Sequence, residues 1–247
     1  MLRLIATLVF VFLFLLLGLP VLGIEWLVSK KNPDLAIRQQ DAILKWAARV
    51  ITRICGVKIV TEGTEKIPAD RSVLYVANHS SFFDVFITYQ LNPTVTGYVS
   101  KNDFLKLPVL PIWMHRLYSV FINRDDLRQS MKTILRAIDY EKQGISMFIF
   151  PEGTRSKDGA VHEFHAGSFK IATKSGALIV PIGIVGSRAI WEAQFPIVHP
   201  GTVYLRYGDP IDPASLSADE KKHIADLVKE QVEGLIADIK KDHGLPE

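Results

Sequence analysis

The distribution of hydrophobic residues divides the chain into two parts. Residues 4–24 form an unbroken apolar block, bounded by Arg3 and Glu25, in which Thr7 carries the only side-chain hydroxyl. As a helix, this block would extend about 31 Å at about 1.5 Å per residue, which is enough to cross the hydrocarbon core of a bilayer. After residue 56, short apolar runs alternate with amphipathic ones.

Two alternatives to a spanning helix fit the apolar block. One is a cleaved signal peptide, but the block is longer than a signal peptide requires and no small-x-small cleavage site follows it. The other is a helical hairpin in one leaflet, broken at Gly18, Pro20 or Gly23. Basic side chains follow the block at Lys30, Lys31 and Arg38. Positive charge there is typical of the cytoplasmic side, so we expect attachment to the inner (cytoplasmic) membrane with the remaining chain facing the cytoplasm.

Residues 41–54 have a helical pattern. One face is apolar and another is basic; the apolar face holds Ile43, Trp46, Ala47, Val50 and Ile54, and the basic face Lys45, Arg49 and Arg53. This arrangement is typical of a helix in the interface of an anionic bilayer. A helix packed on the protein core, with its basic side in water, gives the same pattern. We therefore interpret residues 1–56 as a membrane anchor with an amphipathic interfacial helix.

The rest of the chain, residues 57–247, alternates between strands and helices. The predicted strands are 57–60, 72–77, 96–100, 118–122, 145–150, 178–184 and 203–207. The predicted helices are 82–90, 127–142, 168–174 and a last one of about 217–241, with short broken helices in 103–116. Ser217 and Glu220 form a capping box at the start of the last helix. The alternation predicts one α/β domain with a mostly parallel mixed sheet flanked by helices.

Composition changes this picture little. The formal net charge of +3 is too small to indicate nucleic-acid binding, and no aromatic-and-basic RNA motif occurs. A single cysteine, Cys55, excludes an internal disulfide and fits a reducing compartment. Its place in a patterned segment favours inert packing over reactivity.

His79 and Asp84 are the first candidates for chemistry. On one helix they would point roughly 140° apart, at about 100° per residue. They can meet if His79 lies on the loop after a strand and Asp84 lies in the first turn of the next helix, which Ser80 or Ser81 would cap. The carboxylate would then hold one imidazole nitrogen and leave the other free as a general base. A helix-capping Asp beside an unrelated surface His would have the same spacing.

Further polar residues follow other predicted strands. They are Lys101, Arg124, Glu152 and Arg155. If the strands are parallel, these residues meet His79 and Asp84 at one edge of the sheet. The two arginines are fork donors suited to a phosphate, and Gly153 lets the backbone approach a ligand. Each feature has an ordinary alternative, since Arg124 could pair with a neighbouring aspartate and Pro-Glu-Gly is common in turns.

Four segments together resemble the four sequence blocks of the glycerolipid acyltransferase family. They are residues 78–84 (NHSSFFD), 121–124 (FINR), 150–156 (FPEGTRS) and 180–182 (VPI). The resemblance covers roughly residues 57–210 and is closest to the 1-acylglycerol-3-phosphate acyltransferases. The chain departs from the family at Ser119, where many members have glycine, and at Asn123, where aspartate is frequent. Neither departure removes a charged candidate residue, and with both present the resemblance does not define the acceptor closely.

The resemblance implies a catalytic domain at residues 57–247 with a glycerol-3-phosphate acyltransferase-like fold and no metal or organic cofactor. His79, held by Asp84, would deprotonate the free hydroxyl of lysophosphatidic acid, and the oxygen would attack the thioester of acyl-CoA or acyl-carrier protein. It also implies acceptor binding by the following residues: Lys101, Arg124, Glu152, Gly153, Thr154 and Arg155. The expected partners are these substrates and membrane lipids. Other lyso-lipids and glycerol 3-phosphate are alternative acceptors.

Three other classes of protein fit parts of the sequence. A serine hydrolase would need a Gly-x-Ser-x-Gly elbow, which does not occur. A metal hydrolase could use His162, Glu163 and His165, but their spacing is not His-Glu-x-x-His. A non-catalytic lipid-binding protein would account for residues 1–56 but not for a base, an acid and phosphate-binding arginines after successive strands.

Overall fold

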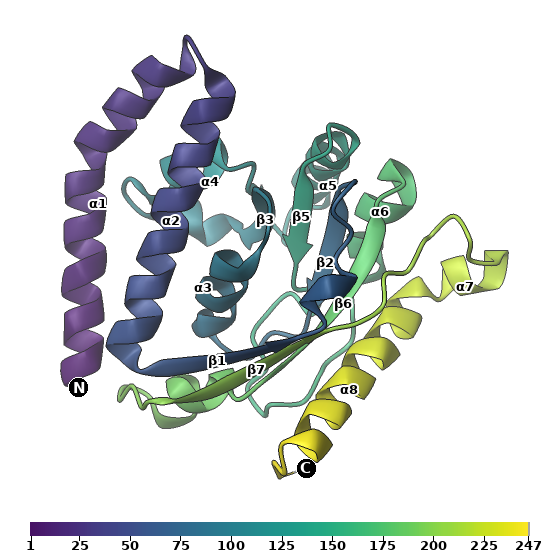
Figure 1. Ribbon diagram of the computed structural model, residues 1–247. Coiled ribbons are helices and arrows are strands. Elements are labelled where there is room, and N and C mark those ends of the chain that lie inside the picture. The colour runs from purple at the N-terminus through teal and green to yellow at the C-terminus, as the bar shows by residue number, and fades with distance from the viewer. Residues whose placement is uncertain (247) are drawn as a thin grey trace.

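The fold is built on one seven-stranded sheet, seen in a computed structural model that describes residues 1–246 (Figure 1). The strand order is β1-β7-β6-β2-β5-β3-β4, and only the β6–β7 pair is antiparallel. The strands are β1 Val57–Glu62, β2 Val73–Ala77, β3 Thr96–Lys101, β4 Val120–Ile122, β5 Ser146–Ile149, β6 Leu178–Val185 and β7 Gly201–Tyr207. The predicted α/β class with a mostly parallel mixed sheet is confirmed.

Helices follow most strands. They are α1 Leu2–Ser29, α2 Pro33–Cys55, α3 Phe82–Leu91, α4 Leu110–Arg116, α5 Leu127–Lys142, α6 Lys170–Ser175, α7 Ala218–Lys222 and α8 Ile224–Asp242. Short 3₁₀ turns also occur, at η1 Thr64–Lys66, η2 Asn102–Lys106, η3 Ala166–Phe169, η4 Ser187–Ile190 and η5 Glu192–Gln194. The Ser217–Glu220 capping box forms as predicted. The single last helix was wrong, because the backbone of His223 leaves helical geometry and separates α7 from α8.

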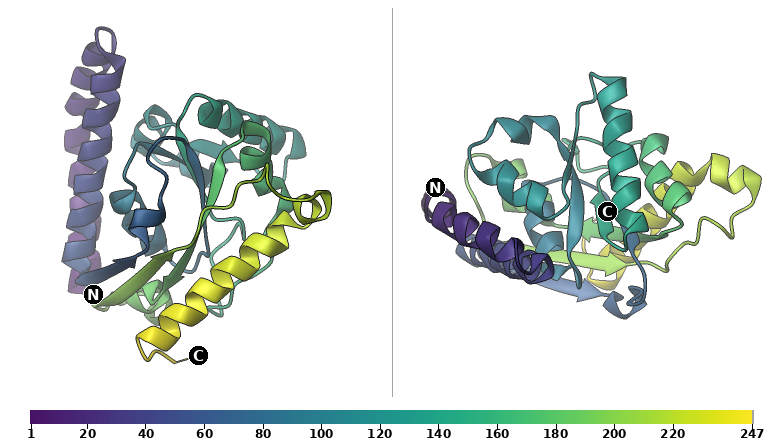
Figure 2. Two further views of the ribbon diagram at one scale, coloured as in Figure 1. Left: turned by 45° about the vertical axis from the view of Figure 1, so that its right-hand side comes forward. Right: turned by 90° about the horizontal axis from the view of Figure 1, so that it is seen from above.

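Both faces of the sheet are covered, which explains why its central strands are apolar throughout. In β2, Val73, Tyr75 and Ala77 join a core under α2 and α3, whereas Leu74 and Val76 join a second core under α5, α6 and α8. This is the two-residue alternation of an extended strand. Figure 2 shows the two layers of helices on opposite sides of the sheet. The catalytic candidates lie between them, at the carboxyl end of β2.

The N-terminal helices form an antiparallel hairpin beside the domain (Figures 1 and 2). α1 is long and apolar enough to cross a membrane, and most of its apolar side chains are exposed. Its helix continues through Pro20, so the break considered at Gly18, Pro20 or Gly23 does not occur. In α2, Ala47, Ala48 and Ile51 are buried, while Trp46 is exposed. α2 therefore packs on the domain core, and part of the predicted apolar face remains outside.

α1 is fixed at three points, one at the end of α2 and two on α4. Arg3 Nη1 donates to the carbonyl of Cys55 at 2.8 Å, and Arg116 Nη1 donates to the carbonyl of Leu22 at 3.0 Å. Between them, Gly18 packs against Trp113, whose ring would lie 3.2 Å from a Cβ at this position. The hairpin is thus a packed part of the structure.

Candidate active site

The site begins where β2 ends. The side chain of Asn78, the residue after β2, hydrogen-bonds to the backbone of the neighbouring strand β6. Its Nδ2 donates to the carbonyl of Ile184 at 2.9 Å, and its Oδ1 accepts from the N–H of Ile184 at 2.8 Å. Three residues later Ser81 caps α3, accepting from the N–H of Phe83 at 3.0 Å. The loop between strand and helix is therefore held at both ends, and His79 lies on it.

His79 and Asp84 meet as the sequence predicted. The Nδ1 of His79 is 2.9 Å from Oδ2 of Asp84, and that oxygen also accepts from the backbone N–H groups of Ser80 and Ser81, each at 2.8 Å. Asp84 is completely buried at the N-terminus of α3, where N–H groups favour a carboxylate. A carboxylate facing Nδ1 holds the proton on that nitrogen and leaves Nε2 with a lone pair. No residue from 1 to 246 hydrogen-bonds to Nε2.

Glu152 supports the loop that carries His79. Its Oε1 accepts from the N–H of His79 at 2.6 Å and its Oε2 accepts from the N–H of His162 at 3.0 Å. The N–H of Ser156 also donates to the carbonyl of His79 at 2.7 Å. Burial raises the pKa of the Glu152 carboxyl group. Both carboxylate oxygens of Glu152 thus bind backbone, so in this structure the residue joins the 150–156 segment to the histidine loop.

Arg124 lies directly over Gly153. Gly153 has φ +78°, and a Cβ there would lie only 1.6 Å from Nη1 of Arg124. Both the backbone conformation and the contact therefore require glycine. Within residues 1–246, Arg124 makes no hydrogen bond or ion pair; the neighbouring Asp126 instead caps α5, accepting from the N–H of Gln129 at 3.0 Å. Its guanidinium is free for a ligand.

Arg155 is held by a residue that the sequence did not suggest. Its Nη1 donates to Oε1 of Glu192 at 2.9 Å, and its guanidinium lies 3.7 Å from the centre of the Phe82 ring. Glu192 also accepts from the hydroxyl of Ser81 at 2.6 Å and from the N–H of Phe82 at 2.8 Å. Glu192 therefore ties Arg155 to the first turn of α3. It was missed because it lies on η5, outside every recognisable motif.

The structure does not join the remaining predicted residues to this network. Lys101 is exposed at the end of β3 and pairs with Asp103. Thr154 is exposed and its hydroxyl has no hydrogen-bond partner among the described residues. The side chain of His162 pairs with Asp158 at 3.0 Å, so this residue joins the network only through the backbone N–H that donates to Glu152. In the part of the chain that the structure describes, no group of three histidine, cysteine, aspartate or glutamate side chains could hold a metal.

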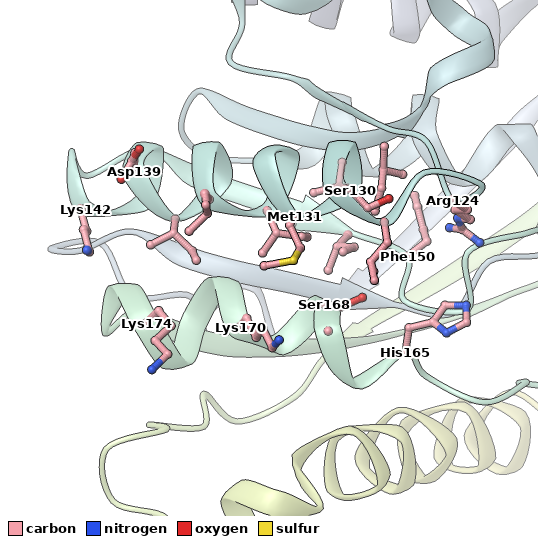
Figure 3. Close-up of a pocket in the computed structure, with 18 residues that line it drawn as sticks. Arg124, Ser130, Met131, Asp139, Lys142, Phe150, His165, Ser168, Lys170 and Lys174 are labelled. Carbon is pink, nitrogen blue, oxygen red and sulfur yellow. The ribbon is translucent and has the colours of Figure 1, made fainter.

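Two hollows adjoin the site on opposite faces of the sheet. The first, the α5–α6 groove, has a volume of about 620 Å³ and lies between α5 and α6 over Val99 and Ile149. Arg124, Phe150 and His165 lie at one end, and Lys142 and Lys174 at the other (Figure 3). The second, the hairpin pocket, has a volume of about 250 Å³ and an almost wholly apolar lining from α1–α4, including Phe10, Phe14, Phe82, Phe86 and Met114.

Comparison with known proteins identifies the family. Residues 58–185 match the acyltransferase family model. The chain belongs to the acyltransferase family. This acyltransferase is 29% identical over 181 residues to the 1-acyl-sn-glycerol-3-phosphate acyltransferase of Borreliella burgdorferi, which covers 72% of each chain. It is 37% identical over 134 residues to a chloroplast protein of that name from Arabidopsis thaliana, covering 54% of this chain and 37% of the relative.

The likeness extends to the three-dimensional structure. The crystal structure of the 1-acyl-sn-glycerophosphate (LPA) acyltransferase PlsC from Thermotoga maritima superposes with a TM-score of 0.73 at 28% sequence identity. The match covers 94% of this acyltransferase and 97% of the Thermotoga protein, and so includes part of residues 1–56. The predicted family and the predicted enzyme class are confirmed.

Proposed function

We propose that this acyltransferase moves an acyl chain from an acyl thioester to the free hydroxyl of 1-acyl-sn-glycerol 3-phosphate, giving phosphatidic acid and a free thiol. The observation that carries the proposal is the His79–Asp84 pair, whose second imidazole nitrogen is unoccupied, next to two arginines suited to a phosphate. The names of the two relatives support the same acceptor.

The proposed reaction follows from this geometry. Nε2 of His79 removes the proton of the acceptor hydroxyl as its oxygen bonds to the thioester carbon, and Asp84 stabilises the imidazolium that forms. The tetrahedral intermediate then collapses, the carbon–sulfur bond breaks, and the imidazolium returns its proton to the leaving thiolate. Such base catalysis typically contributes about 10²–10⁴ in rate. No step needs a metal or an organic cofactor.

Arg124 and Arg155 bind the acceptor phosphate in this proposal. Guanidinium groups bind phosphate through paired hydrogen bonds, and Arg124 has no partner among residues 1–246. Gly153 leaves room for the guanidinium of Arg124, because it has no Cβ. Glu152, the preceding residue, positions the loop of His79 beside Gly153. Lys101 and Thr154 are exposed near strand or loop ends at this edge and remain candidates for contacts with the bound lipid.

The N-terminal hairpin attaches the enzyme to the cytoplasmic face of the inner membrane in this proposal. The exposed apolar surface of α1 supports attachment, and Lys30, Lys31 and Arg38 after α1 support the orientation. The hairpin pocket lies against the same two helices and is bordered by Phe82, next to the arginine site. An apolar lining beside the bilayer suits a lipid chain.

One experiment tests the function. The full chain, purified in detergent, is given labelled acyl-CoA or acyl-carrier protein with a panel of lyso-lipids and glycerol 3-phosphate, and thiol release and lipid product are measured. Phosphatidic acid formed only with lysophosphatidic acid supports the proposal. Thiol release without any acceptor indicates a hydrolase, lipid binding without turnover indicates a binding protein, and a different product assigns another acceptor.

A further inference from the structure

The two hollows beside the site have opposite chemical character. The hairpin pocket lies on the face covered by α2 and α3, next to the exposed apolar surface of α1. The α5–α6 groove lies on the other face, and its rim carries lysines. Figure 2 shows α1 and α2 on one side of the sheet and α5 and α6 on the other. A ligand from the bilayer and a ligand from water would therefore reach the same sheet edge from different sides.

The α5–α6 groove ends beside the base, with the ring of Phe150 between them. Phe150, at its near end, stacks on the imidazole of His79 with 4.1 Å between ring centroids. Figure 3 shows the labelled side chains running from Arg124, Phe150 and His165 to Lys142 and Lys174. A long ligand with its reactive group at Phe150 would extend between the two helices toward the lysines.

The far end of the groove is a site for negative charge. Lys142, Lys170 and Lys174 are exposed, and none makes an ion pair with any other residue in the range 1–246. Two acids lie nearby. Asp139 lines the groove without an ion pair of its own among the described residues, whereas the buried Glu141 turns its Oε2 to the hydroxyl of Ser175, at 3.0 Å. α6 contributes no acidic side chain. Three free cations therefore face one carboxylate.

The dimensions of the groove match the arm of an acyl thioester. Helix α5 extends about 22 Å from Leu127 to Lys142 at about 1.5 Å per residue. The phosphopantetheine arm has roughly 13 bonds between its sulfur and its phosphorus, or about 15 Å when extended at the rise of a backbone chain. The remaining distance is comparable to the length of a lysine side chain. The arm also carries methylenes and a dimethyl group, which suit the apolar walls formed by Met131, Ile134 and Leu135.

We propose that the α5–α6 groove binds the phosphopantetheine arm of acyl-CoA, with the thioester at Phe150 and the phosphates on Lys142, Lys170 and Lys174. The inference rests on the proposed function, because it assumes a thioester donor. Lys142 and Lys174 lie at the far end of the groove and Lys170 lies partway along it, so the positive charge lies away from Phe150, as the phosphates of coenzyme A lie away from its sulfur. The donor thus enters from the water side and the lipid acceptor from the hairpin side.

The test compares two triple variants of the full chain in detergent. One is Lys142→Gln/Lys170→Gln/Lys174→Gln. Its matched control is Arg128→Gln/Lys132→Gln/Arg136→Gln, which removes equal charge from exposed residues of α5 that do not line the groove.

Binding of unacylated coenzyme A is measured by titration calorimetry, and the KM values of acyl-CoA and acyl-pantetheine by thiol release. We expect the groove variant to weaken coenzyme A binding and raise the acyl-CoA KM at least tenfold, with acyl-pantetheine and kcat unchanged. The control should leave all four values unchanged.

Several outcomes would overturn the proposal. They are equal effects of both triple variants, an increase in the acceptor KM alone, and loss of activity with acyl-carrier protein while acyl-CoA is unaffected. A second variant tests the walls: Leu135→Trp narrows the groove at an exposed position and should raise the KM of both acyl-CoA and acyl-pantetheine. Coenzyme A binding needs no turnover, so lysine-dependent binding without transfer would refute the proposed function alone. Transfer with lysine-independent binding would refute this inference alone.

Discussion

The imidazole of His79 lies almost parallel to the ring of Phe150, with 4.1 Å between centroids and an interplanar angle of 19°, while its Nδ1 faces Asp84 at 2.9 Å. The stacking fixes the plane of the imidazole, and the hydrogen bond fixes its rotation within that plane. Together the two contacts set the direction of Nε2. Phe150 directly follows β5 and Asp84 lies on α3, so the base is aligned by two different elements of the fold.

His79→Ala should lower kcat by about 10²–10⁴, because it removes the general base without disturbing the buried Asp84. The measurement is acceptor-dependent thiol release, with circular dichroism to verify folding. His162→Ala is the matched control, since the His162 side chain is exposed and pairs with Asp158, and the backbone N–H that donates to Glu152 is kept in the variant. A loss of only a few-fold in His79→Ala, or an equal loss in the control, would contradict the role of His79.

Gly153→Ala should raise the acceptor KM, because its Cβ would displace the Arg124 guanidinium. It should also lower the free energy of unfolding by about 1–2 kcal/mol, the usual cost of a positive φ for a residue with a side chain. Gly144→Ala is the control: its φ is +84°, but nothing lies within 4 Å of the new Cβ. The control should lose similar stability and keep its KM. Equal acceptor KM values in the two variants would show that Arg124 does not contribute to acceptor binding.

Glu192→Gln should raise the acceptor KM with little change in kcat, because Glu192 positions Arg155 and does not contact His79. Arg155→Ala should have a similar effect, and the double variant should be no worse than the more impaired single one, since the two residues act as a pair. Glu163→Gln, at an exposed position, is the control. A fall in kcat at constant KM would assign Glu192 to the alignment of α3 instead.

Glu141 should make stability depend on pH. Burial raises the pKa of its carboxyl group from 4.5 to about 8. Between these values the folded protein binds more protons than the unfolded chain, so the free energy of unfolding falls as pH rises, by up to about 1.4 kcal/mol per pH unit. Chemical denaturation of wild type and Glu141→Gln at pH 5 and pH 8 checks this. In Glu141→Gln the free energy of unfolding should no longer fall between pH 5 and pH 8, whereas in Asp139→Asn, at an exposed position, it should fall as in wild type. If it fell equally in Glu141→Gln, the pH dependence would not come from Glu141.

Phe12→Asp/Leu16→Asp should reduce sedimentation of the protein with phospholipid vesicles several-fold, because both side chains are exposed on α1, at 65% and 51%. Leu127→Asp is the control, since Leu127 is even more exposed but lies on α5, across the sheet. Sedimentation that is lost in the control and retained in the α1 variant would place the membrane-binding surface elsewhere.

The sequence was sufficient for the elements whose signals are local. The bounds of α5 were predicted as observed, since Asp126 caps it and its apolar positions recur at helical spacing. The contact between His79 and Asp84 followed from a strand, a short loop and a capping serine, all within a few residues. Because ligand-binding residues gather at the carboxyl ends of parallel strands, Arg124, Glu152 and Arg155 were predicted to lie near them.

Interactions between distant segments could not be predicted in this way. Glu192 is far along the chain from Ser81 and Phe82, and no spacing rule joins η5 to α3. Lys101 was expected at the site, but Asp103 pairs with it from two residues away. The sequence also gave no sign that β7 runs antiparallel to β6, because a parallel and an antiparallel neighbour leave the same pattern in a buried strand.

If α1 attaches the enzyme to a bilayer as proposed, the three contacts that fix α1, through Arg3, Gly18 and Arg116, limit how the rest of the enzyme can move relative to that bilayer. A helix joined by a flexible linker would let the domain change its orientation and its distance from the headgroups. Here the depth of α1 in the bilayer would determine the distance between the catalytic edge of the sheet and the bilayer surface. A lysophospholipid would then have to move along the bilayer normal until its hydroxyl reached that edge.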